Sequence, residues 1–324
     1  MKIVIPGGSG QVGTILARAF QQRGDEVVVL SRTPEQKPWR VVQWDGGSTG
    51  AWTADFEGAD AIINLAGQSV NCRYTEDNRR IIMESRIKST RIIGEAIACA
   101  KHAPGIWLQA STATIYAHRF DAPNDEATGV IGGSEPNAPD TWRFSIDVAT
   151  SWERVADEWP TPRTRKVLMR SAIIMSPNHG GPFDMLLGLV RFGLGGTCGS
   201  GKQYVSWIHD QDFVRSVIWL MQHRELDGAV NLAAPNPLGN REFMQVLRGA
   251  AHMPVGLPAT EWMLELGAFL MQSETELILK SRRVVPTRLL QSGFEFQFPT
   301  WAVAARDLYS RWRENGHVAH RGTN

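Results

Sequence analysis

Three glycines near the amino terminus have the spacing that brings a phosphate group close to the backbone. Gly7, Gly10 and Gly13 follow the apolar run from Ile3 to Ile5 and precede a segment whose apolar residues recur at helical spacing. This pattern predicts a strand, a tight turn and a helix. The first N–H groups of a helix lack internal partners and lie at the positive end of its dipole, so they attract phosphate, and glycine lets the phosphate reach them. The residues expected to form this phosphate-binding turn are Gly7, Ser9, Gly10, Gln11, Val12 and Gly13.

The end of the second apolar run, DEVVVLSR, indicates which dinucleotide the turn would bind. In nucleotide-binding folds an acidic residue at this strand end bonds the ribose 2′-hydroxyl of NAD, whereas an arginine accommodates the 2′-phosphate of NADP. Here the run ends in Ser31 and Arg32, without an acid. A guanidinium is always charged and forms paired hydrogen bonds with phosphate. We therefore expect NADP as the cofactor, with Ser31 and Arg32 beside its 2′-phosphate; the alternative is a solvated surface arginine.

Apolar runs and helical patterns alternate along the first half of the chain. The expected strands cover residues 25–32, 40–44, 60–67, 105–111 and 165–175, and the expected helices cover 75–102 and 147–159. The strands are nearly continuous in apolar residues, as in a parallel sheet with helices on both faces. This repetition predicts an α/β fold, namely a Rossmann-type doubly wound parallel sheet with a smaller, mostly helical C-terminal lobe.

A change in composition at about Ser176 marks the expected domain boundary. Loops rich in glycine, proline and asparagine begin there, and the last eighty or so residues look mostly helical. We expect residues 1–175 to form the dinucleotide-binding domain, with segments near 205–235 returning to it. Residues 176–313 would form a substrate-side lobe, and residues 314–324 a disordered tail.

Small residues end the fourth and fifth predicted strands, where a cofactor would lie. The fourth ends in NLAG, whose Leu65, Ala66 and Gly67 leave room for it. The fifth ends in ASTATIYA, which resembles the S-S-A-T-V-Y-G motif of the extended short-chain dehydrogenase/reductases, the group containing nucleotide-sugar epimerases and dehydratases. The resemblance implies that Thr112 is the catalytic Ser/Thr and that Tyr116 is a neighbouring structural or substrate-facing tyrosine.

Further motifs narrow this resemblance to one subgroup. They are SWERVA at 151–156, GLGGTCGSGKQYVSWIHDQD at 193–212, APNPLGNREF at 234–243 and VVPTRLLQSGFEFQFP at 284–299. They look like the NADP-dependent epimerase-family proteins that carry a C-terminal module similar to DUF1731. The resemblance implies an oxidoreductase or epimerase acting on a small carbonyl, alcohol or sugar-like substrate. It also places Ser111 beside the cofactor and lets Arg86, in SRIKST, reach the cofactor phosphates, although a solvated helix charge is an equal alternative for Arg86.

One element of the parent family is missing. Its members carry Tyr-x-x-x-Lys on the helix after the fifth strand, where the lysine lowers the pKa of the tyrosine so that the phenol can exchange a proton with substrate. Positions four residues after the four tyrosines are occupied by Asn78, Phe120, Ile208 and Arg313, so the pair does not occur in the sequence. When SWERVA is aligned with that helix, Ser145 and Ala149 take the two positions.

Two interpretations follow from this gap. In one, Thr112 holds a substrate oxygen and Tyr116, Asp147 or His209 carries the proton. In the other, the protein binds NADP(H) without ordinary turnover, as a regulator or redox sensor. The alternatives for the two acid–base candidates are structural: Asp147 would begin a helix, and His209 would end a strand before a helix capped by Asp210 or Asp212.

Composition excludes several other classes of function. With 34 basic and 33 acidic residues the net charge is +1, so nucleic acid is not an expected partner. No apolar stretch approaches the roughly 20 residues of a membrane span, and the N-terminal run is too short for a signal peptide. The three cysteines lack metal-binding spacing and fit a reducing, cytoplasmic location. We expect no metal site, a small-molecule substrate, and a monomer or homodimer. The segment GTCGSGKQ at 196–203 imitates a P-loop but lacks its final hydroxyl and its strand-to-helix context.

Overall fold

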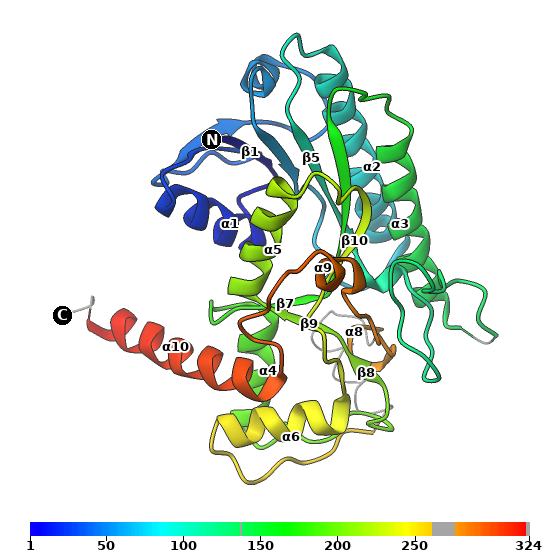
Figure 1. Cartoon of the computed structure of the whole chain (residues 1–324). Coiled ribbons are helices and arrows are strands. Elements are labelled where there is room, and N and C mark those ends of the chain that lie inside the picture. Colours follow the sequence, from blue (N-terminus) through cyan, green and yellow to red (C-terminus); the bar gives the residue numbers. More distant parts are fainter. Residues whose placement is uncertain (137, 261–275, 322–324) are drawn as a thin grey trace. The chain divides into compact units, whose positions relative to one another are not determined.

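The computed structural model describes residues 1–136, 138–260 and 276–321, and these residues divide into two compact units (Figure 1). The first unit comprises residues 1–115, 143–170 and 214–230; the second comprises residues 116–142, 171–213 and 231–324. The first differs from the predicted domain of residues 1–175 because the chain leaves it after residue 115 and returns at residue 143. The segment that comes back to it late in the sequence, 214–230, falls inside the predicted range of 205–235.

A seven-stranded sheet forms the first unit, and its strand order is β10-β6-β5-β4-β1-β2-β3. Its strands are β1 (Lys2–Pro6), β2 (Glu26–Ser31), β3 (Arg40–Gln43), β4 (Ala61–Asn64), β5 (Ile106–Thr112), β6 (Arg165–Ser171) and β10 (Gly228–Leu232). Ile3 of β1 pairs in parallel with Val27 on one side and with Ala61 on the other. The chain order therefore reverses at β1, and the carboxyl edge beside such a reversal is where ligands bind in open α/β sheets. The predicted Rossmann-type fold is confirmed.

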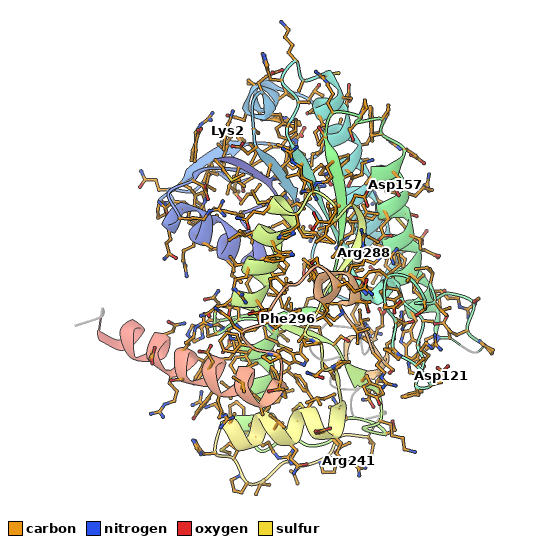
Figure 2. All side chains as sticks on the ribbon, in the orientation of Figure 1. Lys2, Asp121, Asp157, Arg241, Arg288 and Phe296 are labelled. Carbon is orange, nitrogen blue, oxygen red and sulfur yellow. The ribbon has the colours of Figure 1, made fainter. Side chains whose placement is uncertain are left out.

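Helices cover both faces of this sheet. They are α1 (Gln11–Gln22), α2 (Glu76–Cys99), α3 (Asp140–Asp157) and α5 (Asp210–Gln222), with 3-10 turns at Ala51–Phe56 and Ala113–Ile115. In Figure 1, α2 and α3 lie over one face, and α1 and α5 lie over the other. The central strands are fully buried, as their continuous apolar sequences require. Figure 2 labels Lys2 at the start of β1 and Asp157 at the end of α3.

The second unit has shorter elements around an aromatic core. They are β7 (Ile173–Met175), α4 (Pro182–Arg191), β8 (Tyr204–Val205), β9 (Trp207–His209), β11 (Leu238–Gly239), α6 (Asn240–Ala250), α8 (Glu276–Leu279), α9 (Thr287–Gln291) and α10 (Trp301–Arg321). Strand β7 pairs in parallel with β9, and β8 pairs antiparallel with β11. The ring of Trp301 stacks on Phe243 at 4.2 Å between centroids and packs against Trp207 at 5.0 Å, which ties α6, α10 and β9 into one core.

Three expectations about elements are corrected. The run 165–175 is two strands in two sheets, because Ala172 N–H bonds Leu232 O and Ile173 N–H bonds Ser206 O, so the chain changes partners there. Helix α3 begins at Asp140, so Asp147 lies within the helix and does not begin it. Helix α10 continues to Arg321, so most of the segment predicted as a disordered tail is helical. Among the residues with described positions, no helix is long and apolar enough to cross a membrane.

Candidate functional site

Two of the three N-terminal glycines are required by the protein's own packing, and the third is not. Gly7 has φ of +73°, and a Cβ there would lie 2.6 Å from Ala66 Cα. A Cβ on Gly13 would lie 2.3 Å from Gly8 Cα. At Gly10 the nearest atom to such a Cβ is Gly7 O at 3.9 Å, so ordinary packing permits a side chain. The absence of a side chain at Gly10 therefore leaves space beside the turn for a ligand.

The start of helix α1 offers unused hydrogen-bond donors. Its N-cap is Gly10 in an extended conformation, without a side-chain cap, and its first turn holds no acidic residue. In the part of the chain that the structure describes, Nε2 of Gln11 is buried without a hydrogen-bond partner. A buried donor of this kind costs free energy unless an acceptor reaches it. The open backbone N–H groups and the Gln11 amide together fit a bound anion such as a pyrophosphate.

At the end of β2, Ser31 and Arg32 lie in different environments. Ser31 is buried, and its hydroxyl is occupied by both the N–H and the carbonyl oxygen of Thr33. Arg32 is exposed, and none of the described residues forms a hydrogen bond or an ion pair with it. The next acid along the chain, Glu35, pairs with Lys37 at 2.9 Å. The guanidinium of Arg32 is therefore available for an external anion.

The NLAG segment is fixed against the glycine turn by a buried amide network. Leu65 N–H bonds Pro6 O at 2.9 Å, and Ala66 N–H bonds Asn64 Oδ1 at 3.0 Å. The Asn64 amide in turn donates to Gln109 Oε1 on β5 at 2.9 Å. Because a Cβ on Gly7 would meet Ala66, the turn and this segment are in direct backbone contact. The structure thus brings together two stretches predicted to hold the cofactor.

Arg86 packs against the loop after β4 and forms a hydrogen bond with its backbone. Its Nη1 donates to Gln68 O and Ile82 O, both at 3.0 Å, and its guanidinium lies 4.9 Å from the ring centroid of Trp152. A Cβ on Gly67 would lie 3.2 Å from Arg86 Cγ. Burial lowers the pKa of Arg86 to about 10. Arg86 therefore holds the backbone of residues 67–68, and this geometry does not direct it at a phosphate.

Ser111 belongs to a buried ion pair that sequence reasoning missed. Its hydroxyl donates to Glu153 Oε1 at 2.5 Å, and both carboxylate oxygens of Glu153 accept from Arg170, at 2.8 and 2.7 Å. Glu153 is the acid of SWERVA, so the motif fastens α3 to β5 and β6. The sequence offered one signal for this ion pair: an acid in the SWERVA motif is followed by an arginine near the end of the next strand.

Thr112 and Tyr116, the two predicted catalytic residues, differ in availability. Thr112 is half-buried, and its Oγ1 accepts from Thr114 N–H at 3.1 Å. Tyr116 is only 2% exposed, and its phenol donates to Asn231 Oδ1 at 2.9 Å in the interior of the second unit. The Asn231 amide donates in turn to Val285 O. This enclosure argues against proton transfer from Tyr116 to a substrate, whereas the Thr112 hydroxyl can still donate a hydrogen bond.

A carboxylate beside Asn231 completes that interior. Glu126 accepts from Asn231 N–H at 2.9 Å and from the N–H of Arg288 on α9 at 3.3 Å (Arg288 is labelled in Figure 2). Burial raises the pKa of Glu126. The surroundings of Tyr116 are thus those of a fixed structural centre.

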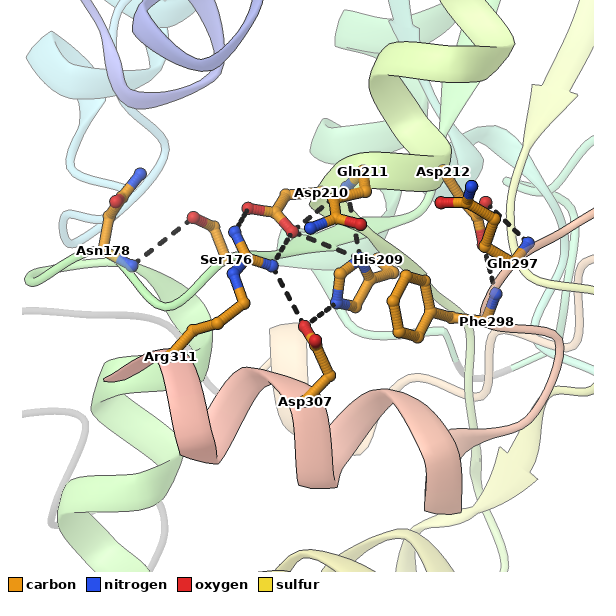
Figure 3. Close-up of polar contacts among 10 residues, drawn as sticks. All are labelled: Ser176, Asn178, His209, Asp210, Gln211, Asp212, Gln297, Phe298, Asp307 and Arg311. Carbon is orange, nitrogen blue, oxygen red and sulfur yellow. Dashed lines mark hydrogen bonds and ion pairs between the residues drawn. The ribbon is translucent and has the colours of Figure 1, made fainter. Parts of the chain in front are cut away.

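His209 lies in a second polar cluster, which also has a structural geometry (Figure 3). Its ring is fully buried and stacks on Phe298 at 3.7 Å. Nδ1 accepts from Gln211 N–H and lies 3.2 Å from Asp210 Oδ1, and Nε2 forms a hydrogen bond with Asp307 Oδ2 at 2.9 Å. Burial lowers the pKa of His209. A buried, neutral histidine that connects β9 to α10 fits the strand-end alternative for this residue, and α5 begins at the next residue, Asp210.

Other sequence features give no second site within the described residues. Helix α4 precedes the segment 196–203 and β8 follows it, the reverse of a P-loop, and Gln203 Nε2 donates within the segment to Cys198 O. No cluster of three or more His, Cys, Asp or Glu able to hold a metal ion occurs among the residues described. Of the residues at the positions of the family's Tyr-x-x-x-Lys, Ser145 is half-buried and Ala149 is fully buried. Asp147, the acid between them, is exposed.

Two family models match the sequence. The model of the NAD dependent epimerase/dehydratase family matches residues 3–139, which include the glycine turn and the strand ends described above. The domain of unknown function DUF1731 matches residues 259–308.

Individual epimerase family proteins are similar to this chain over nearly its full length. An epimerase family protein of Staphylococcus epidermidis is 31% identical over 307 residues, covering 95% of this chain and 98% of the relative. The crystal structure of human epimerase family protein SDR39U1 with NADPH has a TM-score of 0.82 and 28% identity, covering 95% and 99% of the two chains. The UDP-N-acetylglucosamine 4-epimerase of Bacillus cereus shares the fold, with a TM-score of 0.73 at 14% identity and coverage of 97% and 99%. The chain therefore belongs to the NAD-dependent epimerase/dehydratase family, in the extended short-chain dehydrogenase/reductase group whose members carry a C-terminal DUF1731 domain.

Proposed function

We propose that this protein binds NADP(H) and transfers hydride between it and a small carbonyl, alcohol or sugar-like substrate. The observation that carries the cofactor choice is Arg32, an exposed guanidinium at the end of β2 for which the described residues provide no partner. The same strand end lacks the acid that would bond an unphosphorylated ribose. The human relative was crystallised with NADPH, which supports this choice.

The residues around the turn support binding of a dinucleotide. The α1 N–H groups and Gln11 Nε2 would hold the pyrophosphate, with Gly10 allowing its approach and Leu65 to Gly67 bordering it. When bound, the cofactor supplies or accepts the hydride. Thr112, at the carboxyl end of β5, would donate a hydrogen bond to the substrate oxygen, which stabilises negative charge that develops there.

Cofactor choice is tested by replacing Arg32. We expect Arg32→Ala to weaken NADPH binding at least tenfold and to leave NADH binding nearly unchanged, because a guanidinium–phosphate pair contributes about 1.5–3 kcal/mol. Titration of tryptophan fluorescence measures both affinities. Arg91→Ala, which removes an exposed arginine from α2, is the matched control for net charge. Equal affinities for NADPH and NADH in the unmodified protein would contradict the assignment.

A second candidate is a non-catalytic NADP(H)-binding regulator. It is favoured by Ser145 and Ala149, which occupy the positions of the family's proton-transferring tyrosine and its lysine. A panel of aldehydes, ketones and keto sugars with NADPH separates the candidates. Tight NADPH binding with no oxidation of NADPH across the panel would favour the regulator. The cytoplasmic location and the monomeric or homodimeric state stay predictions.

A further inference from the structure

Helix α4 has apolar side chains on two opposite faces, and the described part of the chain covers only one of them. The covered face lies in the aromatic core of the second unit and consists of Phe183, Leu187 and Val190. Met185 and Leu189 lie on the other face and are 41% and 37% exposed. A helix that is apolar on all sides is normally enclosed on all sides. The sequence of α4 is therefore that of an enclosed helix, whereas one copy of the chain leaves half of it open.

The open face of α4 continues beyond the end of the helix. Phe192, the first residue after it, is 84% exposed. Leu194 folds back against the helix, because its N–H bonds Leu189 O at 2.9 Å, and Leu257 N–H bonds Gly193 O at 2.7 Å. Leu194 and Leu257 are 51% and 59% exposed. This continuous surface, called the α4 patch below, consists of Met185, Leu189, Phe192, Leu194, Val255 and Leu257.

The α4 patch is large for a surface in contact with water. At about 200 Å² for a fully exposed large apolar side chain, the exposed fractions of its six residues correspond to roughly 650 Å². Monomeric proteins rarely expose contiguous apolar patches of more than a few hundred Å². A stable interface buries about 800 Å² on each partner, part of it polar. The α4 patch thus supplies most of the area that one subunit contributes to a dimer.

The charges that border the α4 patch have partners within the chain. Helix α4 carries two charged residues, Asp184 and Arg191. Asp184 accepts from Trp312 Nε1 at 2.6 Å, and the guanidinium of Arg191 lies 4.9 Å from the ring centroid of Trp312. Arg248, beside the loop 255–257, donates to Gly195 O at 2.7 Å. An anionic lipid surface would require free cations around an apolar face. An uncharged patch instead suits a two-fold contact, in which every group lies near its own copy.

Gly188 forms a notch in the open face of α4. It follows Met185 by three residues and precedes Phe192 by four, so the three residues share one side of the helix. A Cβ on Gly188 would meet no atom within 4 Å, and its φ is not positive, so the described chain does not require glycine there. Glycine inside a helix destabilises it relative to alanine. The missing side chain therefore leaves room for a backbone or side chain from outside this copy of the chain.

A two-fold axis that passes between Gly188 and Leu189 makes this face complementary to itself. Two copies of α4 related by that axis run antiparallel, and Phe192 of each copy lies opposite Met185 of the other. Leu189 of each copy then lies opposite the notch at Gly188. The largest exposed ring thus meets an adaptable methionine, and a leucine fills the space that glycine leaves. Reciprocal pairs of this kind are what a two-fold contact requires.

We propose that the α4 patch is the interface of a homodimer, in which α4 of one copy packs antiparallel against α4 of the other about a two-fold axis at Gly188 and Leu189. The proposal does not depend on the proposed function, because none of the patch residues belongs to the candidate cofactor site.

Sedimentation velocity over a series of protein concentrations measures this association. We expect the unmodified full chain to sediment at twice its mass of 35.9 kDa. Phe192→Asp and Leu189→Asp should each raise the Kd of the dimer at least 100-fold, because each places like charges in a desolvated two-fold contact. Val303→Asp is the matched control, since Val303 is 42% exposed and lies on α10 outside the patch. Circular dichroism of the variants verifies that all of them fold.

Two results would overturn the proposal. One is an unmodified protein that remains monomeric at about 100 μM, a concentration at which a specific dimer would form. This result includes the case in which the monomer floats with vesicles of anionic phospholipid, which would assign the patch to a lipid surface. The other is a dimer that persists in both Phe192→Asp and Leu189→Asp, which would place the interface elsewhere.

Gly188→Ala separates association from folding. In dilute, monomeric protein this variant should resist urea at least as well as the unmodified chain, because alanine favours the helix and its Cβ meets no atom of the chain. The Kd of its dimer should nevertheless rise at least tenfold, because the added methyl group fills the notch that Leu189 of the other copy would occupy. An unchanged Kd would show that the helices do not meet at Gly188, and the proposed contact would be wrong.

Discussion

Helices α1 and α5 begin in opposite ways: α1 follows β1 after the glycine turn, and α5 follows β9 without an intervening residue. Helix α1 starts after Gly10 with no side-chain cap, no acid in its first turn and a buried amide donor without a partner among the described residues. Helix α5 starts with two acids in its first turn, Asp210 and Asp212. Asp212 accepts the N–H groups of Gln297 and Phe298, at 2.9 and 2.8 Å, and Asp210 accepts two hydrogen bonds from Arg311, both at 2.9 Å (Figure 3).

The contrast indicates what each helix start is for. Carboxylates at the start of α5 complement the helix dipole and receive donors from the chain itself, so this end is complete without a ligand. The start of α1 has no carboxylate, its Gln11 amide donor is open, and Gly10 leaves space for a ligand to reach it. An uncapped helix start beside a sheet edge is thus a better indicator of a binding site than the presence of polar residues, because His209 and its neighbours are more polar yet fully engaged.

The largest expected effect separates the two kinds of glycine within the α1 turn. Gly13→Ala places a Cβ 2.3 Å from the backbone of Gly8, which we expect to cost about 3 kcal/mol of unfolding free energy. Gly10→Ala meets no atom closer than 3.9 Å and should lose much less unfolding free energy than Gly13→Ala, because only the N-cap preference for glycine is lost, yet it should bind NADPH at least tenfold more weakly. Denaturant unfolding and fluorescence titration measure the two properties. If Gly10→Ala unfolds as readily as Gly13→Ala, or binds NADPH normally, the turn is not kept open for a ligand.

A smaller effect is expected when the start of α5 loses its partner. Arg311→Met removes both hydrogen bonds to the buried Asp210 carboxylate and the ion pair with Asp307 at 3.1 Å, and we expect a loss of about 2 kcal/mol in unfolding free energy. Arg306→Met is the control on the same helix, because Arg306 is exposed and, among the residues described, its side chain bonds only Ala302 O of its own helix. Equal stability of these two variants in urea would show that the ion pairs of Arg311 contribute little to the folded state.

The sequence predicted the first unit well because its signals are local. Apolar runs define the strands, and the glycine spacing defines the turn. The carboxyl ends of parallel strands fall at one edge of the sheet, whichever strands are neighbours. The split of the run 165–175 into β6 and β7 was not predictable in this way, since it depends on Leu232 and Ser206 accepting bonds from residues far away in sequence. The same holds for Ser111, whose hydroxyl is directed by Glu153, 42 residues later.

The smallest expected effect is the pH dependence of the unfolding free energy that buried His209 causes. Burial lowers the pKa of His209 in the folded state from its ordinary value of 6.5, so the unfolded state binds this proton more readily. By linkage, the stabilisation is present above about pH 6.5 and is lost as the pH falls below it. We expect the unfolding free energy to decline between pH 7.5 and about 5.5 and His209→Gln to lose part of that slope, while His102→Gln, at an exposed position, retains it. Superimposable profiles for His209→Gln and the unmodified protein would contradict a neutral His209. Helix α1 has no acidic residue in its first turn, whereas α5 has two beside His209. We therefore expect this pH dependence from the start of α5 and not from the start of α1.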